Sequence, residues 1–221
     1  MSARENILKN IREANSVGNR EDAIAQSAAR RKVVLSKLTA RERGPLPAMN
    51  WEPVPRFKER CLAMMSTVDT VASLADVPQA VAAYVKERNL PASGACWPEF
   101  GALDWAGAGL SIAARPSNGD DKIGITGAYC ALADNGTLML LSGEHTHATT
   151  SLLPENHIAV VPAPRIVRSM EDAWDLLRQE HGTLPRQVNF VSGPSRTADI
   201  EMTLVLGAHG PFRVHVIILS S

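Results

Sequence analysis

The first forty residues place apolar side chains at the spacing of helices. A capping-box pattern, Ser2-Ala-Arg-Glu5, precedes a narrow apolar stripe and predicts an amphipathic helix over residues 3–14. Asn19 can cap a second helix, which we expect to extend to about Leu38 because acidic residues open it and basic residues close it. Two consecutive helices are therefore expected before any sheet.

The pattern changes after a proline-rich stretch. Residues 43–55 hold four prolines and predict an extended linker. From Phe57 onward, helical segments alternate with short apolar runs bounded by glycine and proline, which is typical of a sheet with crossover helices. We expect residues 1–56 to form a helical extension with a linker, and residues 57–221 to form one α/β domain.

The spacing of apolar residues also predicts the individual helices and strands of the α/β domain. In residues 170–181 the apolar positions recur at i, i+3, i+4 and i+7, which predicts a surface helix. Two further helices are expected at residues 57–66 and 76–88. Strands are expected at residues 92–96, 109–114, 127–133, 137–142, 157–162, 187–191 and 213–219. The last strand ends in a continuous apolar run, which indicates an inner or well-covered position.

Composition narrows the class of protein. Hydrophobic residues make up 45% of the 221 residues and charged residues 21%, which is enough apolar material for a folded core. No run approaches the roughly 20 apolar residues that cross a bilayer, and the charged first residues do not resemble a signal peptide. We expect a cytoplasmic protein without a membrane span.

The three cysteines, Cys61, Cys96 and Cys130, lie far apart in the sequence. An odd number without a CxxC pair indicates neither a disulfide framework nor an iron–sulfur or zinc ligand set. We therefore expect buried thiols and no cofactor held by this chain.

Charge is distributed unevenly although the formal net charge is zero. Residues 1–60 hold 13 Lys and Arg against 7 Asp and Glu, a charge of +6, whereas residues 61–221 hold 10 against 16, a charge of −6. A basic extension can dock on its own acidic domain, on a partner or on an anionic polymer, but a solvated helical face is the simpler interpretation. We expect no nucleic-acid partner.

The first motif, GITGAYCALADNGTLML, spans residues 124–140 and predicts a hairpin. Asn135-Gly136 supplies the positive φ angles of a tight turn between two apolar runs. Asp134 would lie at the tip beside Thr137, where it can bond the backbone or a ligand. These residues, with Gly127, are candidates for substrate binding, and turn chemistry alone is the alternative.

The second motif, SLLPENHIAVVPAPRIV, predicts a strand entered and left through prolines. His157 lies at its start and is a candidate for substrate binding, although a histidine there can equally be a structural residue. Arg165 follows the strand and can pair with the acidic helix 170–181 or with an anionic ligand, of which the helix is favoured.

The third motif, SGPSRTADIEMTLVLGAHGP, predicts a strand that passes through a small-residue loop into a helix. Free backbone N–H groups at such a helix start can hold a carboxylate or phosphate. The candidate anion-binding residues are Ser192, Gly193, Ser195, Arg196 and Thr197. Asp199 and Glu201 would lie in the first turn, either as partners of Arg196 or as acid/base groups. A well-capped buried helix is the alternative.

The pair His145 and His147 is a weak candidate for a metal site. On a strand, H-x-H would point both rings to one face, but no HExxH pattern frames them, so no metal is expected. Nucleotide and serine-hydrolase motifs are also missing: the sequence has no GxSxG and no phosphate-binding P-loop, and Ile112 stands where a dinucleotide fingerprint needs its third glycine.

The three motifs, in this order, resemble the hallmark stretches of the LUD-domain family, and the resemblance covers about residues 92–219. It implies a three-layer α/β/α fold similar to the sugar-phosphate isomerase and CoA-transferase group. It also implies a role with two iron–sulfur partner proteins in oxidising L-lactate to pyruvate. The resemblance assigns no catalytic residue.

Three functional hypotheses follow. The leading one is an accessory subunit of a lactate-oxidising system that binds lactate, pyruvate or a partner surface near the candidate residues. The second is a stand-alone isomerase or CoA-transferase-like enzyme, with Arg196 gripping an anionic small molecule and Asp134, Asp199 or Glu201 as base or nucleophile. The third is an adaptor that acts through its basic N-terminal helices.

Overall fold

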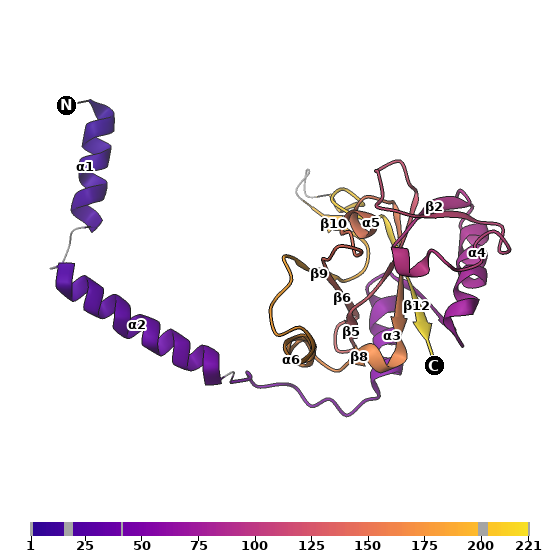
Figure 1. Cartoon of the computed structure of the whole chain (residues 1–221), viewed down its shortest axis with the longest axis horizontal. Helices are drawn as coiled ribbons and strands as arrows, with labels where there is room; N and C mark the ends of the chain where they lie inside the picture. The colour runs from indigo at the N-terminus through magenta and orange to yellow at the C-terminus, as the bar shows by residue number, and fades with distance from the viewer. Residues whose placement is uncertain (1, 16–19, 41, 199–202, 221) are drawn as a thin grey trace. The chain divides into compact units, whose positions relative to one another are not determined.

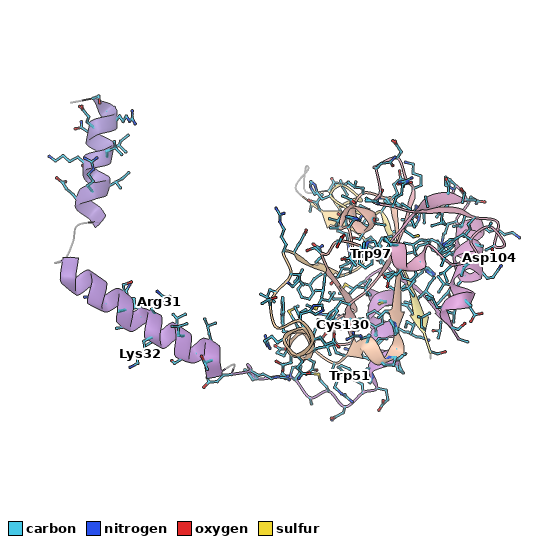
Figure 2. The ribbon with its side chains drawn as sticks, viewed as in Figure 1. Arg31, Lys32, Trp51, Trp97, Asp104 and Cys130 are labelled. Carbon is cyan, nitrogen blue, oxygen red and sulfur yellow. The ribbon has the colours of Figure 1, made fainter. Side chains whose placement is uncertain are left out.

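The computed structural model describes residues 2–15, 20–40, 42–198 and 203–220. The chain divides into two compact units, Met1–Pro47 and Ala48–Ser221. The first unit contains α1 (Ala3–Asn15) and α2 (Arg20–Ala40), as the sequence predicts. Their described side chains are exposed, and Figure 2 shows Arg31 and Lys32 projecting from α2. None of the described helices is both long and apolar enough to cross a membrane.

The second unit begins before the expected boundary. Helix α3 spans Pro53–Ala63 instead of residues 57–66, because two prolines fit the first turn, where the missing N–H groups have no helical partner. The division expected between residues 56 and 57 falls inside this helix. Arg168 fixes the segment before it by donating hydrogen bonds to the carbonyl oxygens of Met49 (2.7 Å) and Trp51 (2.9 Å).

A six-stranded sheet forms the centre of this unit, and all its neighbouring strands run parallel. Its order is β1 (Thr67–Val71), β12 (Arg213–Leu219), β7 (Asn156–Pro162), β4 (Ile123–Gly127), β2 (Ser93–Cys96) and β3 (Ser111–Ala114). In Figure 1, α4 (Val77–Glu87) lies on one side of β12 and α3 on the other. The structure is thus a mixed α/β fold with a parallel sheet flanked by helices, which confirms the predicted class.

A smaller sheet lies beside the central one. Its order is β8 (Ile166–Val167), β5 (Cys130–Leu132), β6 (Thr137–Leu141) and β9 (Val188–Val191). Helix α6 (Met170–His181) packs Ala173 and Leu177 against it. The remaining elements are α5 (Thr149–Leu152), β10 (Arg196–Thr197), β11 (Val205–Leu206) and three 3-10 turns at Leu74–Asp76, Pro98–Phe100 and Ala163–Arg165.

The expected strand over residues 127–133 is wrong, because the chain changes sheets there. Strand β4 ends at Gly127, and β5 starts at Cys130 in the smaller sheet. The Ala128 amide still donates to Val160 in the central sheet (3.0 Å), whereas the Tyr129 amide donates to Met139 in the smaller one (2.8 Å). This crossing places residues 127–129 between the two sheets.

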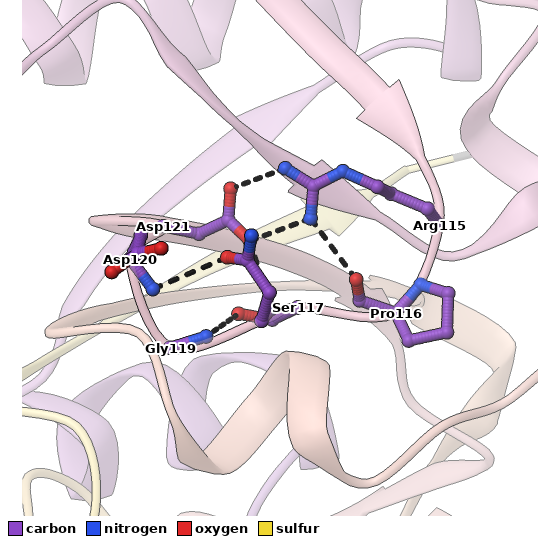
Figure 3. A network of polar contacts seen from close by, with 7 residues as sticks. Arg115, Pro116, Ser117, Gly119, Asp120 and Asp121 are labelled. Carbon is purple, nitrogen blue, oxygen red and sulfur yellow. Dashed lines mark hydrogen bonds and ion pairs between the residues drawn. The ribbon is translucent and has the colours of Figure 1, made fainter.

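The loop between β3 and β4 is held by a salt bridge. Both terminal nitrogens of Arg115 donate to the Asp121 carboxylate at 2.8 Å (Figure 3). This pairing lowers the pKa of Asp121, whose side chain is 8% exposed. The loop returns the chain from the edge strand β3 to the inner strand β4.

Truncating a central residue of β12 tests how far the fold depends on this strand. Ile217 is fully buried, so Ile217→Ala is expected to lower the free energy of unfolding by about 2–5 kcal/mol. Leu184→Ala is the control, since Leu184 is 67% exposed and should cost less than about 0.5 kcal/mol. Urea denaturation measures both values, and equal losses would contradict a central role for β12.

Candidate functional site

A cavity of about 700 Å³ lies at the carboxyl edge of the parallel sheet. Gly127 at the end of β4, Pro162 at the end of β7 and Leu219 at the end of β12 border it, together with Trp97, which follows β2. Open parallel sheets bind ligands at this edge, because the loops that leave the strands enclose a crevice there. The cavity is therefore the candidate functional site.

Most of the cavity wall is apolar. The apolar lining residues are Leu74, Trp97, Phe100, Ala128, Leu141, Val160, Pro162, Pro185 and Leu219. Trp97 is buried among the side chains of the larger unit (Figure 2), and its indole N–H donates to the carbonyl oxygen of His147 (3.1 Å), which fixes the ring. A wall of this kind favours a ligand with an apolar body.

Glu99 supplies a carboxyl group to this wall. Its side chain lies directly against Gly127, where a Cβ atom would approach Glu99 Oε1 to 2.5 Å. Desolvation raises the pKa of this carboxyl, and a hydrogen bond from the Gly127 backbone partly opposes the rise. Gly127 thus leaves the space that Glu99 occupies, and Glu99 is the candidate proton donor or acceptor of the cavity.

A polar network contributes to the wall of the cavity through Tyr129, Arg165 and His181. The Tyr129 hydroxyl donates to Glu180 Oε2 (2.7 Å), and Arg165 donates to Glu180 Oε1 (2.8 Å). The Arg165 guanidinium also lies 5.1 Å from the centre of the Tyr129 ring, which His181 meets edge-on at 5.5 Å. This pairing lowers the pKa of Glu180 and raises that of Arg165. Arg165 therefore pairs with helix α6, as favoured from sequence, and its charge is compensated within the protein.

Of the predicted site residues, Gly127 lines the cavity, whereas several others lie around the end of α3. Gly136 has φ +75°, and a Cβ there would come within 2.8 Å of the α3 backbone at Arg60 and Cys61. The Thr137 hydroxyl is hydrogen-bonded to that of Ser192, and a Cβ at Gly193 would lie 2.3 Å from the carbonyl oxygen of Met64. These residues pack the hairpin and the third motif onto α3.

Asp134 belongs to the same turn. Its amide donates to the carbonyl oxygen of Arg168 (3.1 Å), its side chain is half-buried, and burial raises its pKa. Glu171 adds to this rise and Arg60 opposes it. Asp134 does not line the cavity.

The helix expected in the third motif is replaced by a strand pair in its described part. Arg196–Thr197 forms β10, which pairs antiparallel with β11 (Val205–Leu206). The Ser195 amide donates to Pro211 (2.9 Å), and Arg196 donates to the carbonyl oxygen of Met64 (3.2 Å). The proposed helix N-terminus is therefore wrong as a source of anion-binding amides. Asp199 and Glu201 lie outside the described residues.

His157 is buried near the amino end of β7. It is fully buried, and its Nε2 is 2.8 Å from Thr126 Oγ1. Burial lowers its pKa to about 4, so the ring is neutral near pH 7. Because the cavity lies at the opposite end of this strand, His157 does not reach it.

His145 and His147 lie in the loop after β6 rather than on a strand. His145 is exposed, and His147 is half-buried with its backbone bonded to Trp97. Across the described ranges, no group of three or more His, Cys, Asp or Glu side chains is placed to hold a metal.

The cavity residues that were not predicted as site residues include Trp97, Glu99, Tyr129 and His181, of which Tyr129 lies within the first motif. Glu99 sits in Trp-Pro-Glu-Phe directly after a predicted strand, and this strand-end position was the one available signal. Tyr129 could be placed at the cavity only once the crossing between the two sheets was known. His181 could be placed there only once the packing of α6 was known.

The parallel sheet and the cavity at its carboxyl edge define the class of protein, an open-sheet α/β domain. The LUD domain family model matches residues 54–219, and the chain belongs to the LUD-domain family. The crystal structure of a DUF162 family protein from Deinococcus radiodurans shares the fold, with a TM-score of 0.56 and 21% identity over 79% of this chain and 100% of that chain.

Curated relatives carry a common name. Lactate utilization protein C of Bacillus velezensis is 36% identical over 128 residues, which cover 56% of this chain and 53% of that protein. Lactate utilization protein C of Bacillus subtilis is 42% identical over 102 residues, which cover 45% and 42%. The alignments thus span about half the length of these relatives.

The packing role of Gly136 can be separated from its φ angle. Gly136→Ala and Gly109→Ala both place alanine at a positive φ, +75° and +77°, but only the former meets the backbone of α3, because the space around Gly109 is open. Each should lose about 1–2 kcal/mol of unfolding free energy to backbone strain, and Gly136→Ala about 1–3 kcal/mol more. Chemical denaturation measures both, and equal losses would show that the close approach to α3 contributes nothing.

Burial of His157 predicts a pH dependence of stability. Its pKa is about 4 in the folded chain and about 6.5 when unfolded, so the unfolded state binds more protons between these values. Stability is then full above pH 6.5 and falls as pH drops toward 4, by about 1.4 kcal/mol per pH unit for this histidine. His157→Gln should remove this contribution and so lower the slope of unfolding free energy against pH in this window by up to that amount. An unchanged slope would show that His157 is protonated equally in both states.

Proposed function

We propose that this chain serves in lactate utilisation. The observation that carries the proposal is the LUD domain over residues 54–219, together with relatives at 36% and 42% identity that bear the name lactate utilization protein C. The cavity at the carboxyl edge of the sheet is the proposed ligand site of this domain. Gly127, from the first motif, shapes it by admitting Glu99.

In the finer form of this proposal, the chain is an accessory subunit that supports oxidation of L-lactate to pyruvate with iron–sulfur partner proteins. The chemistry of the cysteines supports this division of labour. Cys61, Cys96 and Cys130 are free, buried and placed on three different elements, and burial raises each thiol pKa, to about 12, 11 and 12 respectively. Among the described residues, no group of three or more His, Cys, Asp or Glu side chains is placed to hold a metal, which supports assigning electron carriage to the partners.

A stand-alone enzyme of the isomerase or CoA-transferase type is the second candidate. The cavity volume lies within the range of small-molecule sites and is far larger than lactate needs. Glu99 offers a carboxyl of raised pKa at its wall, which suits proton transfer to a larger organic substrate. Arg196 donates a hydrogen bond to the carbonyl oxygen of Met64 (3.2 Å) and does not line the cavity, so this candidate rests on Glu99 and not on an anion grip by Arg196.

Growth on lactate tests the proposed role. Deleting the gene for this chain from its host should abolish growth on L-lactate and leave growth on pyruvate unchanged, because pyruvate enters after the proposed oxidation. Complementation with Glu59→Gln should restore growth fully, since Glu59 is 64% exposed on α3, whereas Glu99→Gln should restore it poorly. Normal growth of the deletion strain on L-lactate would overturn the proposal.

Purified protein separates the two candidates. The accessory subunit alone should not reduce a redox dye with L-lactate, and should support dye reduction after the iron–sulfur proteins are added. The stand-alone enzyme should instead convert a CoA ester or a sugar phosphate without any partner. Lactate-dependent dye reduction by the chain alone would contradict the division of labour.

A further inference from the structure

A second hollow, of about 210 Å³, lies at the opposite, amino edge of the central sheet. Thr67 at the start of β1 and Arg213 at the start of β12 line it, together with Tyr84 and Arg88 at the end of α4. Met65, Pro194, Leu206 and Phe212 give it an apolar side. Its volume suits a ligand of a few atoms, in contrast to the large cavity at the carboxyl edge.

Two arginines bring positive charge to this hollow. Arg213 Nη1 lies 3.4 Å from Asn156 Oδ1, and the guanidinium stacks on the ring of Phe212. No carboxylate in the described part of the chain forms a salt bridge with Arg213. Arg88 forms its salt bridge with its sequence neighbour Glu87, at 3.3 Å, and that glutamate is 68% exposed. An exposed pair of this kind is weak, so both guanidinium groups can bind another anion.

Hydroxyl groups complete the lining. Thr67 Oγ1 is 2.8 Å from His215 Nδ1, and the His215 ring stacks on Tyr84 with centroids 4.3 Å apart. Burial raises the pKa of Tyr84, and the nearby charges of Arg88 and Arg213 partly oppose the rise. Tyr84 therefore stays protonated near pH 7. Burial lowers the pKa of His215, and the carboxylate of Asp69, 3.5 Å from its Nε2, opposes this shift.

We propose that this hollow binds a small anion, either a short monocarboxylate or inorganic phosphate, between the guanidinium groups of Arg213 and Arg88. Both anions offer several oxygen acceptors, which a planar guanidinium pairs with two at a time. The hydroxyls of Thr67 and Tyr84 are further hydrogen-bonding groups on the wall. The proposal does not depend on the role in lactate utilisation.

The third motif contributes to the wall of this hollow, although the sequence predicted that it would bind the anion itself. Its Pro194 and Leu206 form part of the wall, and Arg196 holds Met64, next to the lining residue Met65. The motif thus shapes one side of the hollow, and the charge comes from arginines outside it.

Calorimetric titration of the full-length protein tests the proposal with sodium L-lactate, sodium pyruvate and sodium phosphate at constant ionic strength, with sodium chloride as reference. At least one of the three anions should bind with one-to-one stoichiometry. Arg213→Gln and Arg88→Gln should each weaken that binding about tenfold, because each removes a charged hydrogen-bond donor. Arg178→Gln is the matched control, since Arg178 on α6 is 37% exposed, as is Arg88.

The outcomes of this titration show which anion binds and whether it binds in the hollow. Binding of lactate or pyruvate alone identifies a monocarboxylate site, and binding of phosphate alone identifies an oxyanion site. Either result supports anion binding in the hollow if the two arginine variants bind that anion more weakly. If Arg213→Gln unfolds the protein, Arg88→Gln decides, because its side chain lies at the exposed end of α4. No binding above chloride, or full binding by the arginine variants, would overturn the proposal. Failure of the growth experiment on lactate would leave this result unaffected.

Discussion

Strand β12 pairs in parallel with β1 on one side and β7 on the other, which joins segments that lie far apart in the sequence. Its partners are residues 67–71 and 156–162, so the central sheet cannot close until the end of the chain inserts between them. Residues 214–219 of this strand are buried, in keeping with a position covered on both faces. Both hollows depend on it, because Leu219 borders the large cavity and Arg213 the small one.

Glycines in β4 shape the carboxyl edge that this sheet provides. A Cβ at Gly124 would lie 1.9 Å from the carbonyl oxygen of Thr150, so only glycine lets α5 approach the strand. Gly127 leaves comparable space for the Glu99 carboxyl. After Gly127 the chain crosses to the smaller sheet and carries Tyr129 to the cavity wall. The hallmark residues Gly-Ile-Thr-Gly therefore act through close packing that positions other side chains.

This explains which features the sequence could predict. The helix Met170–His181 and the strand Arg213–Leu219 have the predicted bounds, because each has an uninterrupted apolar period. Strands β1 and β4 were not predicted. The sequence of β1, Thr-Val-Asp-Thr-Val, has only two apolar residues, and β4 carries two glycines that suggest a turn. The candidate site was harder, because motif residues such as Gly136 and Gly193 serve contacts with α3, and nothing local in the sequence shows that helix beside them. Glu99 has no motif of its own and becomes a site residue only when Gly127 is placed against it.

The positions of the two hollows limit what they can do together. Arg213 and Leu219 stand at opposite ends of β12, and six residue steps of extended chain span about 20 Å. An anion held by Arg213 is therefore out of reach of Glu99, and it cannot be the molecule that exchanges a proton with that carboxyl. If the two sites influence each other, the effect must pass through the strands between them, whose residues are closely packed and leave little room for rearrangement. The small hollow is thus best understood as a separate binding site and not as a subsite of the large cavity.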